Sequence, residues 1–489
     1  MAHDHAFASA ARLTIDGKLV EAEGARRFDD VNPANGQAIG SVPDASPADL
    51  DAAIGAARRS FDTTSWSQDH ELRARCLAQF YDALVAERET LRTLLVAESG
   101  IPVGLTSGSP IDLIIGQVQY WSELPLKYEY ETFLPDLQFG AATNHRMIRR
   151  EPIGVVGAIT PWNFPVLIAL RKVATALASG CTVVLKPPPD TPWTSLELGR
   201  IAAERTEIPA GVFSVVTSSD HGIGEQLVQD PRVDMIDFTG STATGRRIMS
   251  VASQTVKRVC LELGGKSANI LLDDADFEKI VPGTVSGVYR HAGQGCAYLT
   301  RLLLPRSRYE EGIEIAAQAT RDMPYGDPLD PSVQQGPLIS QKQRERVLGY
   351  IGKGRREARL IAGGGVPVHL PDGYFVEPTL FADADPTATI AQEEIFGPVL
   401  TVIPYDDVDE AVAIANSTIY GLAGSVSSDD RDRAVAVARR IRAGNVDVNG
   451  GTWFAADSPF GGLKQSGLGR EGGVFGLEEH MEIKTICYL

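Results

Sequence analysis

The pattern of apolar and polar positions changes character along the chain. In the first 150 residues apolar positions recur at helical spacing, as in residues 46–61, which open with Ser46-Pro47, a typical helix start. From residue 153 onward, short apolar runs rich in β-branched residues alternate with helical stretches. These runs are IGVVGAIT (153–160), TVVLKP (182–187), VFSVVT (212–217) and MIDFTG (235–240). The alternation of strand and helix predicts a parallel sheet that is covered by helices on both faces.

A second alternating block runs from about residue 266 to residue 465. Its strand-like segments are SANILL (267–272), RLLLP (301–305) and VLTVIPY (399–405). Because 489 residues are too many for one hydrophobic core, we expect two α/β domains.

Two further strand-like segments have no partner strand beside them in the sequence. They are RMIRREPIGV (146–155) and HMEIKTICYL (480–489). Backbone groups of a strand need hydrogen-bond partners, so we expect these segments to pair with each other or with the sheet of another subunit.

Composition and charge narrow the class of protein. With 43% hydrophobic and 22% charged residues, the chain has the composition of an ordinary soluble enzyme. A net charge of -17 disfavours nucleic acid and anionic membranes as partners. No apolar run reaches the ~20 residues that span a bilayer, and the first 17 residues lack the basic head and apolar stretch of a signal peptide.

The five cysteines are widely spaced, odd in number and form no CxxC pair. This usage argues against a disulfide framework and against a zinc site, so no metal centre is predicted. It favours a reducing compartment, and we expect the protein to be cytoplasmic.

Three polar residues stand at positions suited to chemistry. Cys296, in HAGQGCAY, has small neighbours that keep a nucleophilic thiol accessible. Glu262 lies in the apolar strand LELGGKS, where burial without a partner raises the pKa of a carboxyl toward that of a general base. Asn163, in TPWNFP, follows a strand end, where its amide can stabilise an oxyanion. The structural alternatives are a packed thiol, a paired carboxylate and a turn asparagine.

The segment TGSTATG (239–245) joins a predicted strand to a predicted helix. Its backbone N–H groups and the helix dipole suit a phosphate. It is not a P-loop, because Arg246-Arg247 stand where Lys and Ser/Thr are needed, and the GxGxxG fingerprint is also absent. An ordinary turn between strand and helix explains this segment equally well.

Together these motifs resemble those of the aldehyde dehydrogenase superfamily, and the resemblance covers nearly the whole chain. The motifs, in order, are VNPANGQAIGSVP (31–43), TPWNFP, TVVLKP, FTGS, LELGGKS, GQGC, GDPLDP (326–331), EEIFGPV (393–399) and NGGTWFAADSPFGGLKQSGLGRE (449–471). The resemblance implies an α/β fold of three parts. These are a Rossmann-type NAD(P)-binding domain (1–131 and 152–264), an α/β catalytic domain (265–477) and a small β oligomerisation domain (132–151 and 478–489).

The resemblance also implies a mechanism. Cys296 would attack the aldehyde carbon to form a thiohemiacetal, with the oxyanion held by the amide of Asn163 and the backbone N–H of Cys296. Hydride transfer to the cofactor would leave a thioester, and Glu262 would activate the water that hydrolyses it. Lys172 and Glu471 match positions that help to relay the proton away from that glutamate.

Binding positions follow from the same resemblance. The implied cofactor positions are Ile159, Thr160, Pro161, Trp162, Lys186, Gly240, Ser241, Gly264, Glu394 and Phe396. The implied aldehyde tunnel consists of Phe164, Leu167, Arg171, Gly295, Trp453, Phe454 and Phe460. An aromatic-lined tunnel favours an apolar aliphatic or aromatic aldehyde, whereas Arg171 would suit the carboxylate of a semialdehyde.

The sequence departs from the family pattern in two places near the site. The family often has a glutamate three residues after Lys186 that grips the ribose hydroxyls, and here Pro189 stands there with Asp190 following. We favour NAD because a nearby acid repels a 2′-phosphate, with NADP left open. Tyr298 is bulkier than expected and would narrow the site.

Three other functions are consistent with parts of the sequence. A CoA-acylating relative is one, but such members lack a glutamate at the position of Glu262. A Cys-His hydrolase using Cys296 and His291 leaves the other motifs unexplained, and the intact set of Cys296, Asn163 and Glu262 argues against a non-enzymatic role. From the resemblance we expect a small-molecule aldehyde as substrate and a homodimer or homotetramer.

Overall fold

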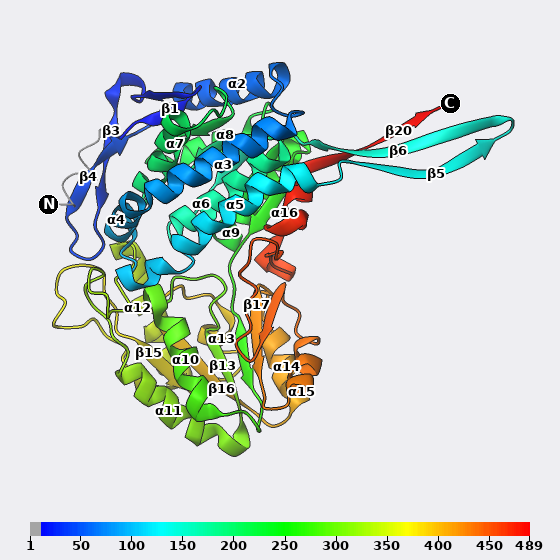
Figure 1. Cartoon of the computed structure of the whole chain (residues 1–489). Coiled ribbons are helices and arrows are strands. Elements are labelled where there is room, and N and C mark those ends of the chain that lie inside the picture. Colours follow the sequence, from blue (N-terminus) through cyan, green and yellow to red (C-terminus); the bar gives the residue numbers. More distant parts are fainter. Residues whose placement is uncertain (1–10) are drawn as a thin grey trace.

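The computed structural model describes residues 11–489, and it consists of two α/β units and a projecting arm (Figure 1). One unit is built on an eight-stranded sheet and the other on a seven-stranded sheet. The signal-peptide prediction concerns the first 17 residues, of which residues 1–10 lie outside the described part. Among the described helices, none is both long and apolar enough to cross a membrane.

The eight-stranded sheet has the order β19-β11-β10-β7-β8-β9-β1-β2. Its parallel strands are β7 (Val155–Ile159), β8 (Thr182–Lys186), β9 (Phe213–Val215), β10 (Met235–Thr239) and β11 (Arg258–Glu262). The short apolar runs of the sequence form these strands because a parallel sheet is buried on both faces. Antiparallel strands complete the edges, namely β1 (Leu13–Ile15), β2 (Lys18–Val20) and β19 (Gly467–Leu468).

Helices cover both faces of this sheet (Figure 1). They are α2 (Pro47–Thr63), α3 (His70–Ala86), α4 (Arg88–Ser99), α5 (Asp112–Lys127), α6 (Pro165–Ser179), α7 (Trp193–Arg205), α8 (His221–Gln229) and α9 (Thr242–Ala252). The predicted start of α2 is confirmed, since the Ser46 side chain accepts hydrogen bonds from the backbone of Ala48 and Asp49 in a capping box. Every residue of α6 is buried, so the polar side chains on this helix lie inside the protein.

The seven-stranded sheet has the order β14-β15-β16-β13-β12-β17-β18. Its strands are β12 (Ala268–Leu271), β13 (Arg301–Pro305), β14 (Arg359–Ala362), β15 (Thr379–Ala382), β16 (Val399–Tyr405), β17 (Ala423–Ser427) and β18 (Asn445–Val448). Only β14 runs antiparallel to its neighbour. The helices of this unit are α10 (Phe277–Tyr289), α11 (Tyr309–Arg321), α12 (Gln341–Glu357), α13 (Thr389–Gln392), α14 (Val408–Asn416) and α15 (Arg431–Ala438).

The arm is a three-stranded antiparallel sheet that projects from the first unit (Figure 1). It consists of β5 (Glu131–Phe139), β6 (Ala142–Pro152) and β20 (Met481–Tyr488). The two strand-like segments without a neighbouring partner in the sequence therefore pair with each other, with Met481 opposite Pro152 and Tyr488 opposite His145.

The last part of the chain returns to the first unit before it enters the arm. β19 pairs with β11, and α16 (Gly473–Glu479) packs against α6. A separate two-stranded sheet joins β3 (Arg27–Val31) to β4 (Ala38–Pro43). The packing of α16 on α6 brings residues near the C-terminus to the buried polar side chains of α6.

Candidate active site

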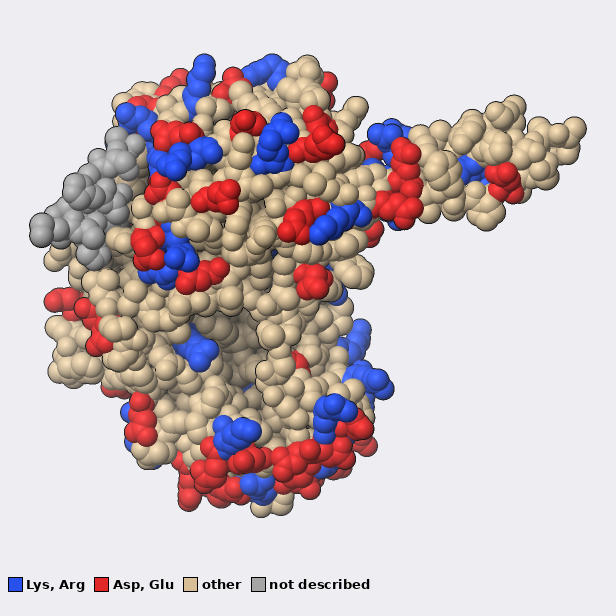
Figure 2. All heavy atoms as spheres, in the orientation of Figure 1, with Lys and Arg blue, Asp and Glu red and all other residues tan. Residues whose placement is uncertain are grey.

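Two cavities meet at Thr239, the last residue of β10. The larger cavity, of about 860 Å³, lies over the carboxyl ends of β7, β8 and β10, with residues 339–346 of the second unit on its other side. The smaller cavity, of about 310 Å³, contains Cys296 and Glu262. Thr239 lines both cavities, so a molecule in one can reach a molecule in the other. Figure 2 shows the face between the two units as hollowed.

The smaller cavity gathers most of the residues that the sequence predicts for catalysis and aldehyde binding. Cys296, Glu262 and Glu471 line it. All the predicted tunnel residues line it too, namely Phe164, Leu167, Arg171, Gly295, Trp453, Phe454 and Phe460. The arrangement places a thiol and a carboxyl at one end of an apolar, largely aromatic chamber.

Cys296 is carried by a loop that follows α10. The turn before it has positive φ at His291, Ala292 and Gly293, which reverses the chain toward the cavity. Burial raises the pKa of the Cys296 thiol to about 12, with the charges of Glu394 and Glu262 adding to the effect. The thiol is therefore neutral, and it needs a base before it can act as a nucleophile.

Asn163 is buried beneath this loop and does not line the smaller cavity. Its side-chain Nδ2 donates to the backbone carbonyl of Gln294 at 2.8 Å. The backbone carbonyl of Asn163 accepts from Nε2 of His291, also at 2.8 Å. Burial lowers the pKa of His291 to about 4, so its ring is neutral and donates to that carbonyl. His291 thus holds Asn163 in place beside the loop of Cys296.

Glu262 ends β11 and is 2% exposed. Neither of its carboxyl oxygens has a hydrogen-bond partner among the described residues. Burial raises the pKa of Glu262 well above its ordinary value, and the charge of Glu471 raises it further, against the opposing charges of Lys172 and Arg171. The predicted effect of unpaired burial on this carboxyl is present in the structure.

Lys172 and Arg171 are neighbours on α6 with different surroundings. The Lys172 ammonium is fully buried and donates to Glu471 and Asp237, each at 2.5 Å. The Arg171 guanidinium lies over the rings of Phe454 and Phe460, 5.2 and 5.3 Å from their centroids, and 3.9 Å from Glu471. Both cations already have partners inside the protein.

Tyr298 forms part of the wall of the smaller cavity. Its ring packs against Gly295, where a Cβ atom would come within 2.5 Å of the ring. Gly295 is therefore needed because Tyr298 is large, and the two residues together set the width of the chamber next to Cys296.

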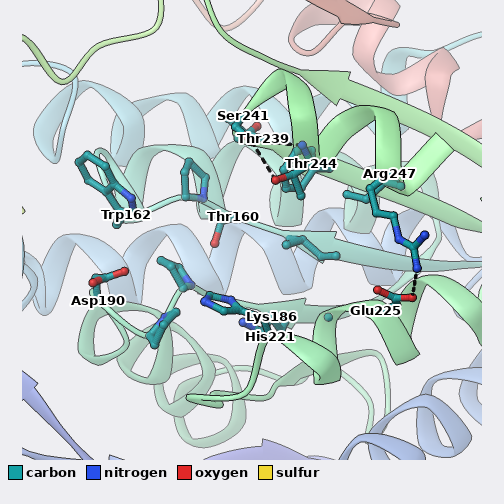
Figure 3. A pocket seen from close by; sticks show the side chains of 18 of the residues that line it. Thr160, Trp162, Lys186, Asp190, His221, Glu225, Thr239, Ser241, Thr244 and Arg247 are labelled. Atoms are coloured by element: carbon teal, nitrogen blue, oxygen red, sulfur yellow. Dashed lines mark hydrogen bonds and ion pairs between the residues drawn. The ribbon is translucent and has the colours of Figure 1, made fainter. Parts of the chain in front are cut away.

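The larger cavity is lined by most of the residues that the resemblance implies for the cofactor (Figure 3). They are Ile159, Thr160, Pro161, Trp162, Lys186, Gly240 and Ser241. Ser241 caps α9, accepting from the backbone N–H of Thr244 at 3.1 Å, so the first turn of this helix faces the cavity. Free N–H groups and the positive end of the helix dipole there suit a phosphate group.

Lys186 lies at the opposite side of the larger cavity from α9 (Figure 3). Burial lowers its pKa to about 8, while the charges of Asp190 and Asp220 oppose that shift. Burial also raises the pKa of Asp190, against the charges of His221 and Lys186. A lysine and an acid therefore occupy the same end of the cavity.

Gly264, Glu394 and Phe396 do not line either cavity. Glu394 accepts from the backbone N–H of Gly265 at 2.9 Å, and burial raises the pKa of Glu394 to about 7. A Cβ atom on Gly264 would come within 2.4 Å of the Glu394 carboxyl. The Phe396 ring lies edge-on to Trp162, with centroids 5.3 Å apart.

The structure adds residues that the sequence did not single out for the site. In the larger cavity these are His221, Glu225, Arg247 and Arg346, with Arg247 and Glu225 paired at 2.6 Å (Figure 3). In the smaller cavity they are Arg290 and Thr239, and the sequence marked Thr239 only as the first residue of TGSTATG. No motif marks the others, since each stands on an ordinary helix or at a helix end. Among residues 11–489 no group of three or more His, Cys, Asp or Glu side chains could hold a metal ion.

Comparison with known proteins decides the family. The sequence model described as the aldehyde dehydrogenase family matches residues 19–486. The chain belongs to the aldehyde dehydrogenase family. It is 39% identical to the geranial dehydrogenase of Castellaniella defragrans, over 100% of this chain and 99% of that protein. It is 40% identical to a 3-succinoylsemialdehyde-pyridine dehydrogenase of a Pseudomonas species, over 96% of this chain and 97% of that protein.

A solved member of the family has the same fold. It is a variant of aldehyde dehydrogenase C from Pseudomonas syringae in complex with NAD+ and octanal, with a TM-score of 0.92 and 39% identity. The match covers 98% of this chain and 97% of that one. The predicted family, the α/β aldehyde dehydrogenase fold and the class of enzyme, an oxidoreductase acting on aldehydes, are confirmed.

Replacement of Tyr298 by Ala should widen the chamber, because its ring fills the space next to Gly295 and Cys296. We expect kcat/KM for a bulky aromatic aldehyde to rise about tenfold relative to that for a short aliphatic aldehyde. Steady-state kinetics with both aldehydes gives the ratio. Tyr488→Ala, an exposed tyrosine of the arm, is the matched control. An unchanged ratio in Tyr298→Ala would show that this ring does not limit access.

Proposed function

We propose that this aldehyde dehydrogenase oxidises an apolar aliphatic or aromatic aldehyde to the carboxylic acid, with NAD as oxidant and Cys296 as nucleophile. One observation carries the proposal. The thiol of Cys296 and the unpartnered carboxyl of Glu262 share an aromatic-lined chamber that joins a cavity of dinucleotide size at Thr239. Nucleophile, base and oxidant can therefore meet at one carbon atom.

The first step is addition of the thiol to the aldehyde. Glu262, when ionised, is the base in the chamber and accepts the proton of Cys296. The sulfur then bonds to the carbonyl carbon, and the carbonyl oxygen becomes an oxyanion. The amide of Asn163, which is fixed by His291 and Gln294, and the backbone N–H of Cys296 are the donors assigned to that oxygen.

The residues of the larger cavity fit a dinucleotide. The capped start of α9 suits the pyrophosphate, and Lys186 lies within reach of the adenosine ribose. The bound nicotinamide would take up the hydride from the carbon attached to Cys296. Phe396 packs against Trp162, which lines the larger cavity, and the charge of Glu394 acts on the Cys296 thiol, so we assign these residues to the nicotinamide half.

The second step is hydrolysis of the thioester. Once Glu262 has released the proton of Cys296 to solvent, it can draw a proton from a water molecule, whose oxygen bonds to the carbonyl carbon. The C–S bond then breaks, the proton passes from Glu262 to the sulfur, and the acid and the thiol are released. A carboxyl of raised pKa is a stronger base than an ordinary glutamate, which suits this step. Its presence supports hydrolysis over transfer of the acyl group to coenzyme A.

The partners of Arg171 support an apolar substrate. Arg171 is not available to bind the carboxylate of a semialdehyde, because it lies over two aromatic rings and beside Glu471, and the other arginine that lines the chamber is the exposed Arg290. The walls around it are apolar and aromatic. The octanal in the related solved enzyme and the geranial in the name of one relative agree with this assignment.

Asp190 supports NAD over NADP. It lines the same end of the larger cavity as Lys186, where the adenosine ribose is assigned. When ionised, its carboxylate would repel a 2′-phosphate, while Pro189 cannot grip the ribose hydroxyls through its side chain. The related solved enzyme was crystallised with NAD+.

The exposed surface of the arm supports a homodimer or homotetramer. Phe133, Phe139 and Ile483 are 67%, 78% and 68% exposed, and the outer part of the arm carries few charged groups on the face seen in Figure 2. Apolar surface of this kind marks protein–protein contacts.

A cytoplasmic location is supported by the five cysteines, which are all free thiols.

Assay of the purified protein with a panel of aldehydes tests the reaction. We expect NAD to be reduced without added coenzyme A or phosphate, and NADP to be reduced at least tenfold less efficiently because of the charge at Asp190. Cys296→Ala should lose this activity, while Cys487→Ala, which removes an exposed thiol of the arm, should keep it. Undiminished turnover in Cys296→Ala would contradict the role of the nucleophile.

Glu262→Gln should separate the two steps, because glutamine cannot accept the proton of the hydrolytic water. We expect a burst of NADH of about one equivalent per active site, slower than in the wild type because the variant also lacks the acceptor of the Cys296 proton, and then steady turnover slowed at least a hundredfold, more than the burst. In the wild type the deacylation rate should rise with pH as Glu262 ionises, since burial raises its pKa, and this dependence should be absent from the variant.

Stopped-flow absorbance measures both phases. Glu98→Gln is the matched control, because Glu98 is also fully buried, with a pKa raised to about 8 by desolvation, but lies outside both cavities. Equal loss of the burst and of the steady rate in Glu262→Gln would count against the assignment of Glu262 to hydrolysis.

A further inference from the structure

A line of buried charged residues leads from the smaller cavity into the protein. Glu471, which lines the cavity, accepts from the Lys172 ammonium at 2.5 Å, and the same ammonium donates to Asp237 Oδ1 at 2.5 Å. The other oxygen of Asp237, Oδ2, lies 3.6 Å from Nε2 of His480. All four side chains are 5% exposed or less.

These side chains come from three parts of the chain. Asp237 is in the middle of β10, and Lys172 is on the buried helix α6. His480 lies between α16 and β20, where the chain leaves the first unit for the arm (Figure 1). The packing of α16 on α6 brings His480 to the polar side of α6.

The hydrogen bond of His480 shows which of its ring nitrogens carries the proton of the neutral ring. Nδ1 lies 2.9 Å from the carbonyl of Gly476, and a carbonyl only accepts, so Nδ1 carries a proton. In the neutral ring Nε2 would then present a lone pair to the Asp237 carboxylate. Neither Nε2 nor Asp237 Oδ2 has a hydrogen-bond partner among the described residues, so a second proton on the ring turns a repulsive contact into an ion pair.

The charges of this group balance when Glu262 is ionised. The three carboxylates of Glu471, Asp237 and Glu262 are then matched by the Lys172 ammonium, the Arg171 guanidinium 3.9 Å from Glu471, and the His480 imidazolium. Arg258, which donates to the backbone on either side of His480, is paired with Glu482 at 3.0 Å. Without the charge on His480, ionisation of Glu262 would leave one uncompensated negative charge in the group.

We propose that Asp237 and His480 are positioning residues for the buried base, with protonated His480 holding Asp237 as a carboxylate and Asp237 holding the Lys172 ammonium beside Glu471. The role of Glu262 as base is taken from the proposed function. The pair keeps the surroundings of Glu262 close to neutral, so that a single proton can enter and leave that carboxyl during turnover.

Two substitutions test the pair through the pH dependence of kcat. In His480→Gln the group loses a positive charge, so Glu262 should ionise at higher pH. The rise of kcat on the acid side of the profile should therefore shift by about half a pH unit to higher pH, which lowers kcat about threefold at a given pH on that side. In Asp237→Asn a negative charge near Glu262 is removed, and the limb should move to lower pH. The double variant should match Asp237→Asn, because His480 then has no carboxylate to pair with.

Two further variants separate charge from packing. His480→Lys keeps a positive charge at this position, and its profile should return toward that of the wild type. His145→Gln is the matched control, since His145 is paired with Asp136 at 2.9 Å on the exposed arm. This variant should leave the pH profile of kcat unchanged. Loss of kcat at every pH in both single variants, with no movement of the limb, would reduce the pair to a structural role and overturn the proposal.

Alkylation of Cys296 gives a readout without aldehyde or cofactor. Negative charge near the thiol raises its pKa, so reaction with iodoacetamide at fixed pH should be about threefold slower in His480→Gln and faster in Asp237→Asn than in the wild type. Mass spectrometry of the Cys296 peptide measures this rate separately from that of the other cysteines.

The two readouts distinguish failure of the inference from failure of the proposed function. A wild-type protein that oxidises no aldehyde would refute the proposed function, while opposite shifts in alkylation would still support the pair. Normal turnover with unchanged alkylation and unchanged pH profiles in both variants would overturn the pair and leave the proposed function intact.

Discussion

The proposed mechanism depends on the burial of the Glu262 carboxyl, which has no hydrogen-bond partner among residues 11–489. A carboxyl buried in this way binds its proton more tightly than one in water, because the charged form loses its hydration. Glu471 adds to this effect, and Lys172 and Arg171 oppose it. The balance gives a base that is strong enough to draw a proton from water and can still release it. The polar residues around the cavity can be understood by how they maintain that balance.

The Glu262 carboxyl is buried because two α/β units meet along one seam. Glu262 ends a strand of the first unit, and Cys296 lies on a loop of the second. The loop can come close because Gly265 lacks a side chain, since a Cβ atom there would lie 2.3 Å from the carbonyl of Cys296. Aromatic side chains line the chamber, and Thr239 lines both this chamber and the larger cavity. Substrate, base and oxidant thus meet at the seam.

Much of this could be predicted from the sequence, because local patterns encode it. Apolar runs predicted the parallel strands, and Ser46-Pro47 predicted the start of a helix that Ser46 caps. The small neighbours of Cys296 indicated a thiol that lines a cavity. Contacts between distant segments could not be read in this way. Asp237 looked like one polar residue in an apolar strand, and His480 like part of a terminal strand, and only the packing of α16 on α6 brings them together. The partners of Arg171 likewise appear only in three dimensions.

The protonation of Glu262 is the most direct test of this account. Infrared difference spectra between the wild type and Glu262→Gln, recorded on the protein without aldehyde or cofactor, isolate the bands of this one carboxyl. Burial and the charge of Glu471 predict that the carbonyl band of a protonated carboxyl persists at pH values at which a glutamate in water is ionised, and that carboxylate bands replace it as the pH is raised further. Carboxylate bands alone down to pH values near 5, as for a glutamate in water, would contradict it.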